Sequence, residues 1–297
     1  MEVTQGLKAF RVHPLFLALL LLYFAAGVLD RAAVAFGSVL LHEIGHVVAA
    51  RRTGVIVTRI ELFPFGGVAR MGGTGALSPT QEITVALAGP VTSLSFFCIG
   101  LGLMHLGYLT AGIGQFFLTV NLMLAVFNLL PGLPLDGGRI LRAWLSGRHG
   151  LGVGTLVAAR TGQLIGLVTI VLGILGPVLG RWGLDAAALG FFIFYAATRE
   201  KRYIPYLFVQ QLAAKEQELT RQRVLPGAVL VATKEARLLE VARFFHPGRF
   251  HFVAVMNEES GKQRLLSEKQ VVEALTTLPS GASIGSLIDE RKDYKPH

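Results

Sequence analysis

The residues with the clearest chemistry are His42, Glu43 and His46, which form the pattern HExxH within an apolar stretch. On a helix, residues four positions apart project from the same face, so both imidazoles can bind one ion. Zn²⁺ accepts two nitrogen ligands of this kind, and a glutamate beside it can take a proton from a water molecule. The spacing therefore predicts zinc-dependent hydrolysis, with His42 and His46 as metal ligands and Glu43 as the catalytic base.

The competing interpretation is a pair of surface histidines on either side of a glutamate that forms a salt bridge. Such an arrangement needs a solvated helix face, but the residues around the motif are largely apolar from Val34 to Leu41 and from Val47 to Ala50. Ionisable side chains at membrane depth are costly, and they mark functional sites. We therefore expect a metal site that lies within the membrane.

A catalytic zinc uses three protein ligands and keeps one position open, so one ligand is still needed. We expect it to be Asp136. Pro131 and Pro134 break the apolar segment before it, and Gly137-Gly138 after it lets the backbone turn sharply. The alternative is that Asp136 caps the following helix. The remaining histidines lie near segment ends, on the opposite side of the predicted topology or in the polar C-terminal part: His13, His105, His149, His246, His251 and His297.

Asn128 is a further candidate, because it lies about two turns before Asp136 in a largely apolar region. A buried amide can hydrogen-bond to the backbone of a substrate or to an oxyanion, which would make Asn128 part of the catalytic machinery. The commoner role of an asparagine in a membrane helix is a hydrogen bond to a neighbouring helix. The sequence leaves both interpretations open.

The composition is that of an integral membrane protein with a soluble part. Of the 297 residues, 52% are hydrophobic and 16% are charged, against about 25% charged in an average soluble domain. The first of the apolar segments is expected to be a retained anchor, since no small-residue cleavage site follows it. Six apolar segments approach the ~20 residues of a membrane-spanning helix, at about residues 14–29, 32–50, 82–106, 112–131, 155–180 and 184–198.

Basic residues predict the orientation of these segments, because lysine and arginine gather in cytoplasmic loops. They cluster before the first segment and after the second, fourth and sixth, whereas the alternate loops hold only Arg31 and Arg181. Both termini are therefore expected in the cytoplasm. The net charge of +9 follows from this topology, so we expect no direct binding of nucleic acid. A single cysteine, Cys98, excludes a disulfide framework or a thiolate zinc site within one chain.

The segment from Gly54 to Pro79 does not have the pattern of a membrane span. Alternation and β-branched residues from Val55 to Leu62 predict a strand, and the pairs Gly66-Gly67 and Gly72-Gly73 are typical of turns. We expect a membrane-associated β-hairpin or sheet whose edge can hold a substrate in an extended form. An ordinary cytoplasmic loop is the alternative.

The charge content rises near residue 201, and the chain is expected to have three parts. Residues 1–200 would form the membrane domain and residues 201–222 a linker helix, because the sequence from Tyr206 to Arg223 is amphipathic. Residues 223–297 would form a small soluble α/β domain. Its apolar patterns predict strands near residues 229–231, 250–256 and 265–266 and helices near residues 236–245 and 268–276.

Together, these motifs make the chain resemble the site-2-protease family of intramembrane zinc metalloproteases. The resemblance implies that the two motif histidines and Asp136 bind Zn²⁺, that Glu43 is the catalytic base and that Asn128 assists in the active site. It rests on His42–His46, on Leu135-Asp136-Gly137 and on further motifs in matching order: Val12-His13-Pro14, Leu62–Gly67, Ala88-Gly89-Pro90 and Asn128–Pro131.

Within this family, the motif order and the short C-terminal part are similar to those of the sporulation branch, the stage IV sporulation protein FB type, which processes pro-sigma-K. This similarity implies a membrane-associated pro-sigma factor as substrate, inhibitory membrane proteins as partners and a place in the outer forespore membrane. The C-terminal part resembles a CBS domain, which implies ATP binding and, because only one copy is present, a homo-oligomer formed through it. No glycine-rich phosphate loop supports nucleotide binding independently.

Two other functions remain open at this point: a membrane transporter regulated by a CBS-type tail, and a zinc-binding membrane protein without catalysis. A transporter should line a pathway with polar groups across both halves of the bilayer, but here they cluster around one pair of motifs. A purely structural zinc site has no need of the base Glu43. We therefore favour an α-helical polytopic membrane protease with a membrane-associated hairpin and a small soluble α/β domain.

Overall fold

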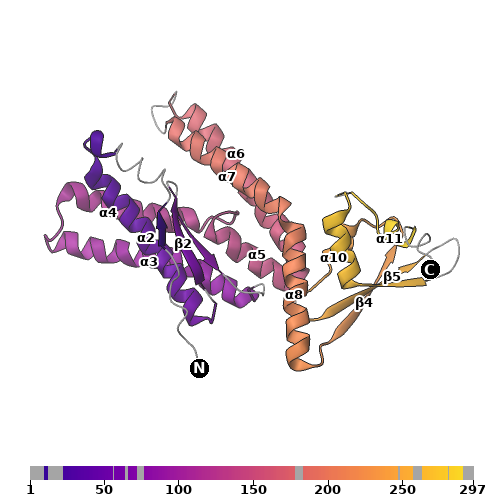
Figure 1. Cartoon of the computed structure of the whole chain (residues 1–297). Helices are drawn as coiled ribbons and strands as arrows, with labels where there is room; N and C mark the ends of the chain where they lie inside the picture. Colours follow the sequence, from indigo (N-terminus) through magenta and orange to yellow (C-terminus); the bar gives the residue numbers. More distant parts are fainter. Residues whose placement is uncertain are drawn as a thin grey trace. The chain divides into compact units, whose positions relative to one another are not determined.

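The computed structural model describes residues 10–12, 23–55, 57–63, 66–71, 77–177, 183–246, 248–256, 263–279 and 281–289. The chain divides into two compact units, the first with residues 1–73 and 80–140 and the second with residues 74–79 and 141–297. Each unit has its own helices and its own three-stranded sheet (Figure 1).

Apolar helices build most of the first unit. α2 packs against α4, and exposed apolar side chains such as Val91, Leu94 and Ile99 cover the outer surface of α3. A surface of this kind is unfavourable in water but is compatible with lipid. The helices are α2 (Leu29–Arg52), α3 (Pro79–His105), α4 (Ala111–Asn128) and the beginning of α5 (Asp136–His149).

Three of the described helices are long and apolar enough to cross a membrane: α2, α3 and α6 (Leu151–Leu175). α4 is apolar but shorter. The predicted segments from 32–50 onward each coincide with a helix, whereas most of the first segment, 14–29, lies outside the described residues. A largely helical membrane protein is therefore confirmed. The number of six spans and the cytoplasmic position of both termini stay predictions.

A small sheet combines one strand that precedes α2 in the chain with two strands that follow it. It has the order β1-β2-β3, with β1 (Phe10–Val12) parallel to β2 (Val57–Phe63) and β2 antiparallel to β3 (Gly66–Met71). The predicted hairpin is confirmed, and the alternative of an ordinary loop is wrong. The strand β1 was not predicted, because three residues are too short to show a period and their partner lies far along the chain.

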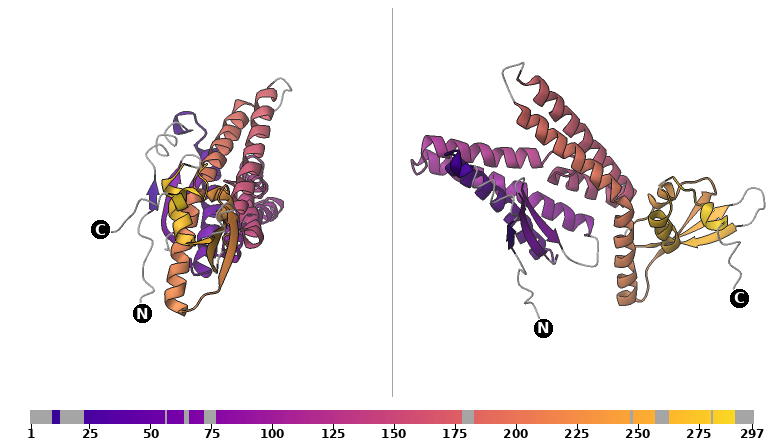
Figure 2. Two further views of the ribbon diagram at one scale, coloured as in Figure 1. Left: turned by 90° about the vertical axis from the view of Figure 1, so that its right-hand side faces the viewer. Right: turned by 45° about the horizontal axis from the view of Figure 1, so that its top comes forward.

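Two long helices of the second unit form an antiparallel hairpin, α6 and α7 (Leu184–Arg202), and Figure 2 shows them side by side. Glycines let their backbones come close. A β-carbon on Gly166 would lie 2.7 Å from the backbone nitrogen of Phe194, and one on Gly190 would lie 2.6 Å from that of Ile170. Close contact between small residues is how helices associate in lipid, where the hydrophobic effect gives no drive.

The C-terminal part of this unit contains a sheet of order β4-β5-β6, in which β4 and β5 are parallel and β5 and β6 are antiparallel. The three predicted strands are confirmed. The predicted helix at residues 236–245 is shorter in the structure, because the chain turns after Ala242. The elements are α8 (Ile204–Gln222), β4 (Gly227–Thr233), α9 (Leu238–Ala242), β5 (Phe250–Met256), β6 (Gln263–Ser267), α10 (Glu268–Thr277) and α11 (Ser286–Asp289).

The core of this part lies on one face of the sheet and includes α8. Ile204, Phe208 and Leu212 lie one turn apart along the helix, so they form one apolar face that is buried with β5 and α10. α8, predicted as a linker helix, therefore packs into the core of the α/β elements. The buried members of this core outside α8 include Leu238, Phe245, Val253, Val255, Leu266, Val271 and Ile284.

A buried ion pair joins α8 to α10. Lys215 Nζ lies 2.5 Å from Glu268 Oε1, and the two side chains are 2% and 3% exposed. The other carboxylate oxygen accepts hydrogen bonds from the backbone N–H and Nδ1 of His251, at 2.9 and 3.2 Å. Burial acts to raise the pKa of Glu268, but the bonds from His251 and the Lys215 charge outweigh it and hold that pKa below its usual value. Burial lowers the pKa of Lys215 in spite of its partner.

Replacing Lys215 by methionine should destabilise this unit, because it leaves the Glu268 carboxylate buried without a cation, a loss of about 3–5 kcal/mol. The matched change Lys269→Met removes an exposed pair with Glu216 between the same two helices, 3.9 Å apart, and should cost less than about 1 kcal/mol. Chemical unfolding of both variants, followed by circular dichroism at neutral pH, measures the difference. Equal losses would show that the buried pair does not anchor α8.

Acid should weaken the same contact. The pKa of Glu268 is lower in the folded chain than in the unfolded one, so its stabilising effect is fully present above the unfolded value of about 4.3. The effect is lost as the pH falls through the lower, folded value. Glu268→Gln should therefore show a smaller loss of stability on acidification than the parent protein.

Candidate metal centre

One face of α2 carries the two histidines of the motif into the interior. Ser38, His42, His46 and Ala50 are spaced by four residues, and all are buried. Because residues at this spacing lie above one another on a helix, they form a single inward stripe. His42 and His46 are 3% and 4% exposed. The helical spacing predicted from the sequence therefore places both imidazoles on the same buried face.

α3 fixes the orientation of both rings. His46 Nδ1 lies 2.7 Å from the carbonyl oxygen of Val85, which can only accept, so Nδ1 carries the proton and Nε2 keeps its lone pair. His42 Nδ1 lies 2.9 Å from Ser93 Oγ, and donation to that oxygen gives His42 the same tautomer. Hydrogen bonds of this kind on the outer nitrogen are what orient metal-binding histidines.

Gly89 of α3 lies directly against the two imidazoles. A β-carbon at this position would overlap the His46 ring and would lie 2.6 Å from His42 Nε2. No other residue type leaves room for the rings and for an ion between them. The sequence motif Ala88-Gly89-Pro90 is therefore explained by close approach of the helix backbone to the site.

The connection between α4 and α5 brings in Asp136, which is the first residue of α5 and is 6% exposed. Gly137 and Gly138 come next. β-Carbons at these two positions would overlap the backbone of Leu129 and of Gly132, so only glycine allows the helix to begin this close to the preceding turn. The two glycines predicted to permit a sharp turn thus set the direction of the Asp136 carboxylate.

Three acceptor atoms converge as a result. Asp136 Oδ2 lies 3.1 Å from His42 Nε2 and 3.1 Å from His46 Nε2, and the two nitrogens are 3.2 Å apart. Buried lone pairs at these distances repel one another unless a positive charge lies between them. A tetrahedral Zn²⁺ needs ligand atoms about 3.3–3.4 Å apart, so the donor set fits zinc within a few tenths of an ångström. Among the described residues, this is the group of three side chains that could hold a metal ion.

Two charged side chains accompany the cluster. Glu43 is half-buried next to His42, and it interacts electrostatically with both imidazoles and with Arg139. Arg139, on the first turn of α5, also acts on Asp136. The predicted base therefore lies beside the converging ligand atoms, and a cation that the sequence did not single out balances the two carboxylates.

The structure gives Asn128 a local contact. Its Nδ2 donates to the carbonyl oxygen of Leu124 at 3.0 Å, and no described contact joins it to the histidines or to Asp136. Asn121, two turns earlier on α4, was not predicted. It is fully buried and donates to Ser38 Oγ at 3.0 Å and to the Phe117 carbonyl at 2.9 Å, so it ties α4 to the histidine face of α2. An amide within an apolar segment was the signal that could have found it.

The chain is similar to known metallopeptidases. The model of peptidase family M50 matches residues 31–114 and 110–173, which include the HExxH motif and Asp136. Rip3 of Mycobacterium tuberculosis is 42% identical over 195 residues, or 62% of this chain and 48% of Rip3. The zinc metalloprotease MJ0392 of Methanocaldococcus jannaschii is 35% identical over 175 residues, or 57% of this chain and 48% of that protein. The chain thus spans about half the length of both relatives.

Two further similarities cover most of the length of the compared protein. Stage IV sporulation protein FB of Bacillus subtilis is 26% identical over 275 residues, which cover 89% of this chain and 90% of that protein. The solved structure of the site-2 protease from Methanocaldococcus jannaschii matches with a TM-score of 0.52 and 28% identity, over 65% of this chain and 90% of that chain. The helical arrangement that carries the motif is therefore similar to that of a site-2 protease.

Replacing Gly89 by alanine should remove the metal from the protein, because the added methyl group occupies the space of the imidazoles. Gly102→Ala is the matched control on the same helix, since a β-carbon there meets nothing within 4 Å. Metal analysis of the purified proteins should give about one zinc per chain for the parent and the control. A full zinc content in Gly89→Ala would contradict this placement of the site.

Proposed function

We propose that the protein is an intramembrane zinc metalloprotease of peptidase family M50, whose model matches residues 31–114 and 110–173. It hydrolyses a peptide bond of a membrane-associated substrate at or near the cytoplasmic face. His42, His46 and Asp136 hold the Zn²⁺, and Glu43 is the catalytic base. The observation that carries the proposal is the convergence of the three ligand atoms at 3.1–3.2 Å on buried helix faces.

The chain supplies the proton transfers of this reaction. A zinc ion held here acts as a Lewis acid that polarises a carbonyl oxygen and makes water more acidic. Glu43 takes a proton from the attacking water and returns it to the leaving amine nitrogen. Arg139 offsets the negative charge that Glu43 and Asp136 bring into an apolar region. Three protein ligands would leave a zinc ion one position for water or substrate, which hydrolysis requires.

Asn128 has a weaker claim to a role in catalysis. Its amide donates to Leu124 within its own helix in the structure. A contact with a substrate therefore requires the side chain to change rotamer when substrate binds. Asn128 lies seven residues after Asn121 on α4. The amide of Asn121 donates to Ser38 on α2, so both asparagines belong to the helix that packs beside the motif helix.

The substrate has to be extended where it is cut, since a helix hides its carbonyl groups in internal hydrogen bonds. β3 lies at one edge of the described sheet, and its neighbour on the other side is β2. β3 also contacts α2, the helix that carries the motif. An extended segment of substrate that adds to this edge would be held by backbone hydrogen bonds close to the motif helix.

The similarity to stage IV sporulation protein FB extends over most of both chains and supports a narrower proposal. The substrate is then a membrane-associated pro-sigma factor, processed as pro-sigma-K is, and inhibitory membrane proteins hold the enzyme inactive. Its location would be the outer forespore membrane, with both termini in the cytoplasm. Binding of ATP to residues 223–297 is part of the same proposal and rests on the resemblance of that sequence to a CBS domain.

We further propose that the C-terminal sheet pairs with that of a second copy. One face of the sheet packs on the core, and the other is apolar and exposed, with Val229 on β4, Phe252 on β5 and Leu265 on β6. An apolar face without charges is complementary to itself, which a two-fold symmetric contact requires. Exposed apolar patches of this kind mark interaction sites.

Replacing Glu43 by glutamine should abolish cleavage while zinc stays bound, because the amide cannot accept the proton and the three ligands are unchanged. Asp136→Asn should instead lower the zinc content together with activity. Each variant is co-expressed with candidate pro-sigma factors, and cleavage is followed by immunoblotting beside metal analysis. Normal processing by Glu43→Gln would rule out the mechanism. If the parent protein cleaves other membrane-associated substrates but no pro-sigma factor, the choice of substrate is wrong.

Replacing Val231 by lysine should dissociate the homo-oligomer, because it places a charge in the exposed apolar face of the sheet. Val224→Lys is the matched control: Val224 is 77% exposed against 69% for Val231, but lies in the connection before β4 and outside the sheet. Light scattering of the purified proteins in detergent gives the mass of each. A monomeric parent protein, or an equal effect of the two changes, would contradict pairing through this face.

A further inference from the structure

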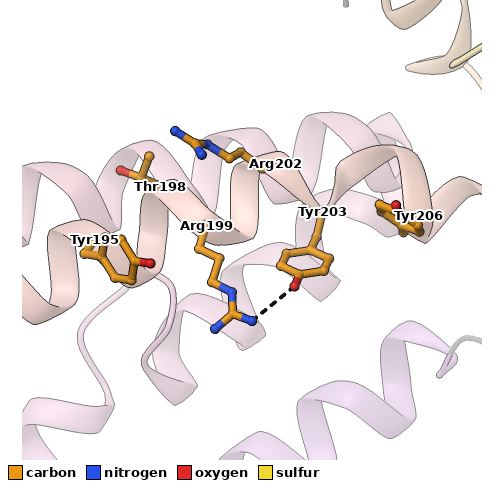
Figure 3. A pocket seen from close by; sticks show the side chains of 6 residues that line it. All are labelled: Tyr195, Thr198, Arg199, Arg202, Tyr203 and Tyr206. Atoms are coloured by element: carbon orange, nitrogen blue, oxygen red, sulfur yellow. Dashed lines mark hydrogen bonds between the residues drawn. The ribbon is translucent and has the colours of Figure 1, made fainter. Parts of the chain in front are cut away.

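The junction of α7 and α8 forms a cavity of about 420 Å³ that shares no residue with the metal centre. α7 ends at Arg202, Tyr203 follows, and α8 begins at Ile204. The volume is in the range of small-molecule sites, about 300–1,000 Å³. Six side chains line the cavity: Tyr195, Thr198, Arg199, Arg202, Tyr203 and Tyr206 (Figure 3).

Cationic and phenolic groups dominate this lining, and none of the six side chains is a carboxylate. Arg199 Nη2 donates to Tyr203 Oη at 3.1 Å, and Arg199 Cζ lies 5.5 Å from the centre of the Tyr203 ring. Figure 3 shows the guanidinium and the hydroxyl turned toward each other, with Tyr195 and Tyr206 farther along the helices to either side and Arg202 on the opposite side of the helix. Because the Tyr203 oxygen accepts this bond, its own proton is available to a further acceptor.

The donors of this cavity suit an anionic oxygen ligand. A guanidinium has five N–H groups, and Tyr203 accepts from one of those on Arg199. In the part of the chain that the structure describes, no ion pair joins Arg199 or Arg202 to a carboxylate. Thr198 is already bonded, since it donates to the Phe194 carbonyl and accepts from Gln163. Planar, fork-shaped guanidinium donors match the geometry of a phosphate group.

A row of side chains leads from these donors to the apolar part of α7. Phe191, Tyr195, Arg199 and Tyr203 are spaced by four residues, so they share one helix face. Phe191 is 64% exposed and Tyr195 is 60% exposed. The order from apolar through aromatic to basic is the order in which a phospholipid presents its acyl chains, its glycerol and its phosphate. Aromatic and basic residues at a helix end are also typical of the membrane interface.

We propose that the α7–α8 junction binds the phosphate of an anionic phospholipid between Arg199 and Tyr203, with the acyl chains along Phe191 and Tyr195. Free phosphate would use the same donors but would leave the exposed apolar row without a partner, so the row favours a lipid. α8 continues from this point into the core of the C-terminal part of the second unit. A lipid bound here holds the place where that part leaves the membrane surface.

Native mass spectrometry of the full-length protein in detergent tests this proposal, with dioleoylphosphatidylglycerol, dioleoylphosphatidylcholine and inorganic phosphate as probes. The parent protein should retain one phosphatidylglycerol in preference to phosphatidylcholine. Arg199→Gln should weaken this retention on the order of tenfold, because it removes charge-assisted hydrogen bonds. Lys201→Gln is the matched control, since it removes one exposed charge from the same helix but does not line the cavity.

Tyr203→Phe removes only the hydroxyl and should weaken retention of the lipid less than Arg199→Gln does. This smaller change keeps the proposal testable if Arg199→Gln fails to fold. Equal losses in Arg199→Gln and Lys201→Gln would reduce the effect to general charge attraction and overturn the site. Equal retention of the two lipids would do the same. Displacement of phosphatidylglycerol by millimolar inorganic phosphate would overturn the assignment to a lipid. Glu43→Gln should retain the lipid as the parent does, so this test is independent of the proposed protease activity.

Discussion

Three buried acceptor atoms that need a shared cation are the constraint on which the first unit depends. His42, His46 and Asp136 present their lone pairs to one another at 3.1–3.2 Å within an apolar set of helices. Water cannot screen them there, so their mutual repulsion is tolerable only with a positive charge between them. The hydrogen bonds from the outer histidine nitrogens to Val85 and Ser93 hold the rings in this arrangement. The packing of these helices and the affinity of the site for a cation thus both follow from the convergence of the three acceptor atoms.

Close packing of small residues makes that arrangement possible. Gly89 lets α3 approach the imidazoles, and Gly137 with Gly138 lets α5 begin against the turn that precedes it. Helices in lipid gain nothing from hydrophobic burial against each other, so contact area and interhelical hydrogen bonds hold them together. The bond from Asn121 to Ser38 is one such interaction, placed one turn from His42. Gly89, Gly137 and Gly138 are therefore as specific to the site as the two histidines and Asp136.

The C-terminal part of the second unit is stabilised mainly by burial of apolar side chains. Its sheet and helices bury an apolar core of the kind found in soluble domains, and α8 is part of that core. The pair of Lys215 and Glu268 is buried with its remaining hydrogen bonds satisfied by His251, which is the condition under which a buried charge pair is tolerated. Since α8 follows α7 after one residue, the lining of the α7–α8 junction lies where the apolar helix hairpin meets this core.

Local periodicity was enough to determine the helix that carries His42, Glu43 and His46 and the strands near Val229 and Phe250, because spacing along the chain fixes which side chains share a face. Asp136 could be predicted as a partner only from the chemistry of the missing ligand. The tertiary structure alone decided the rest: the bonds from Val85 and Ser93, the approach of Gly89, the role of Asn121 and the packing of α8. Such contacts join residues dozens of positions apart, and no repeating pattern in the sequence records them.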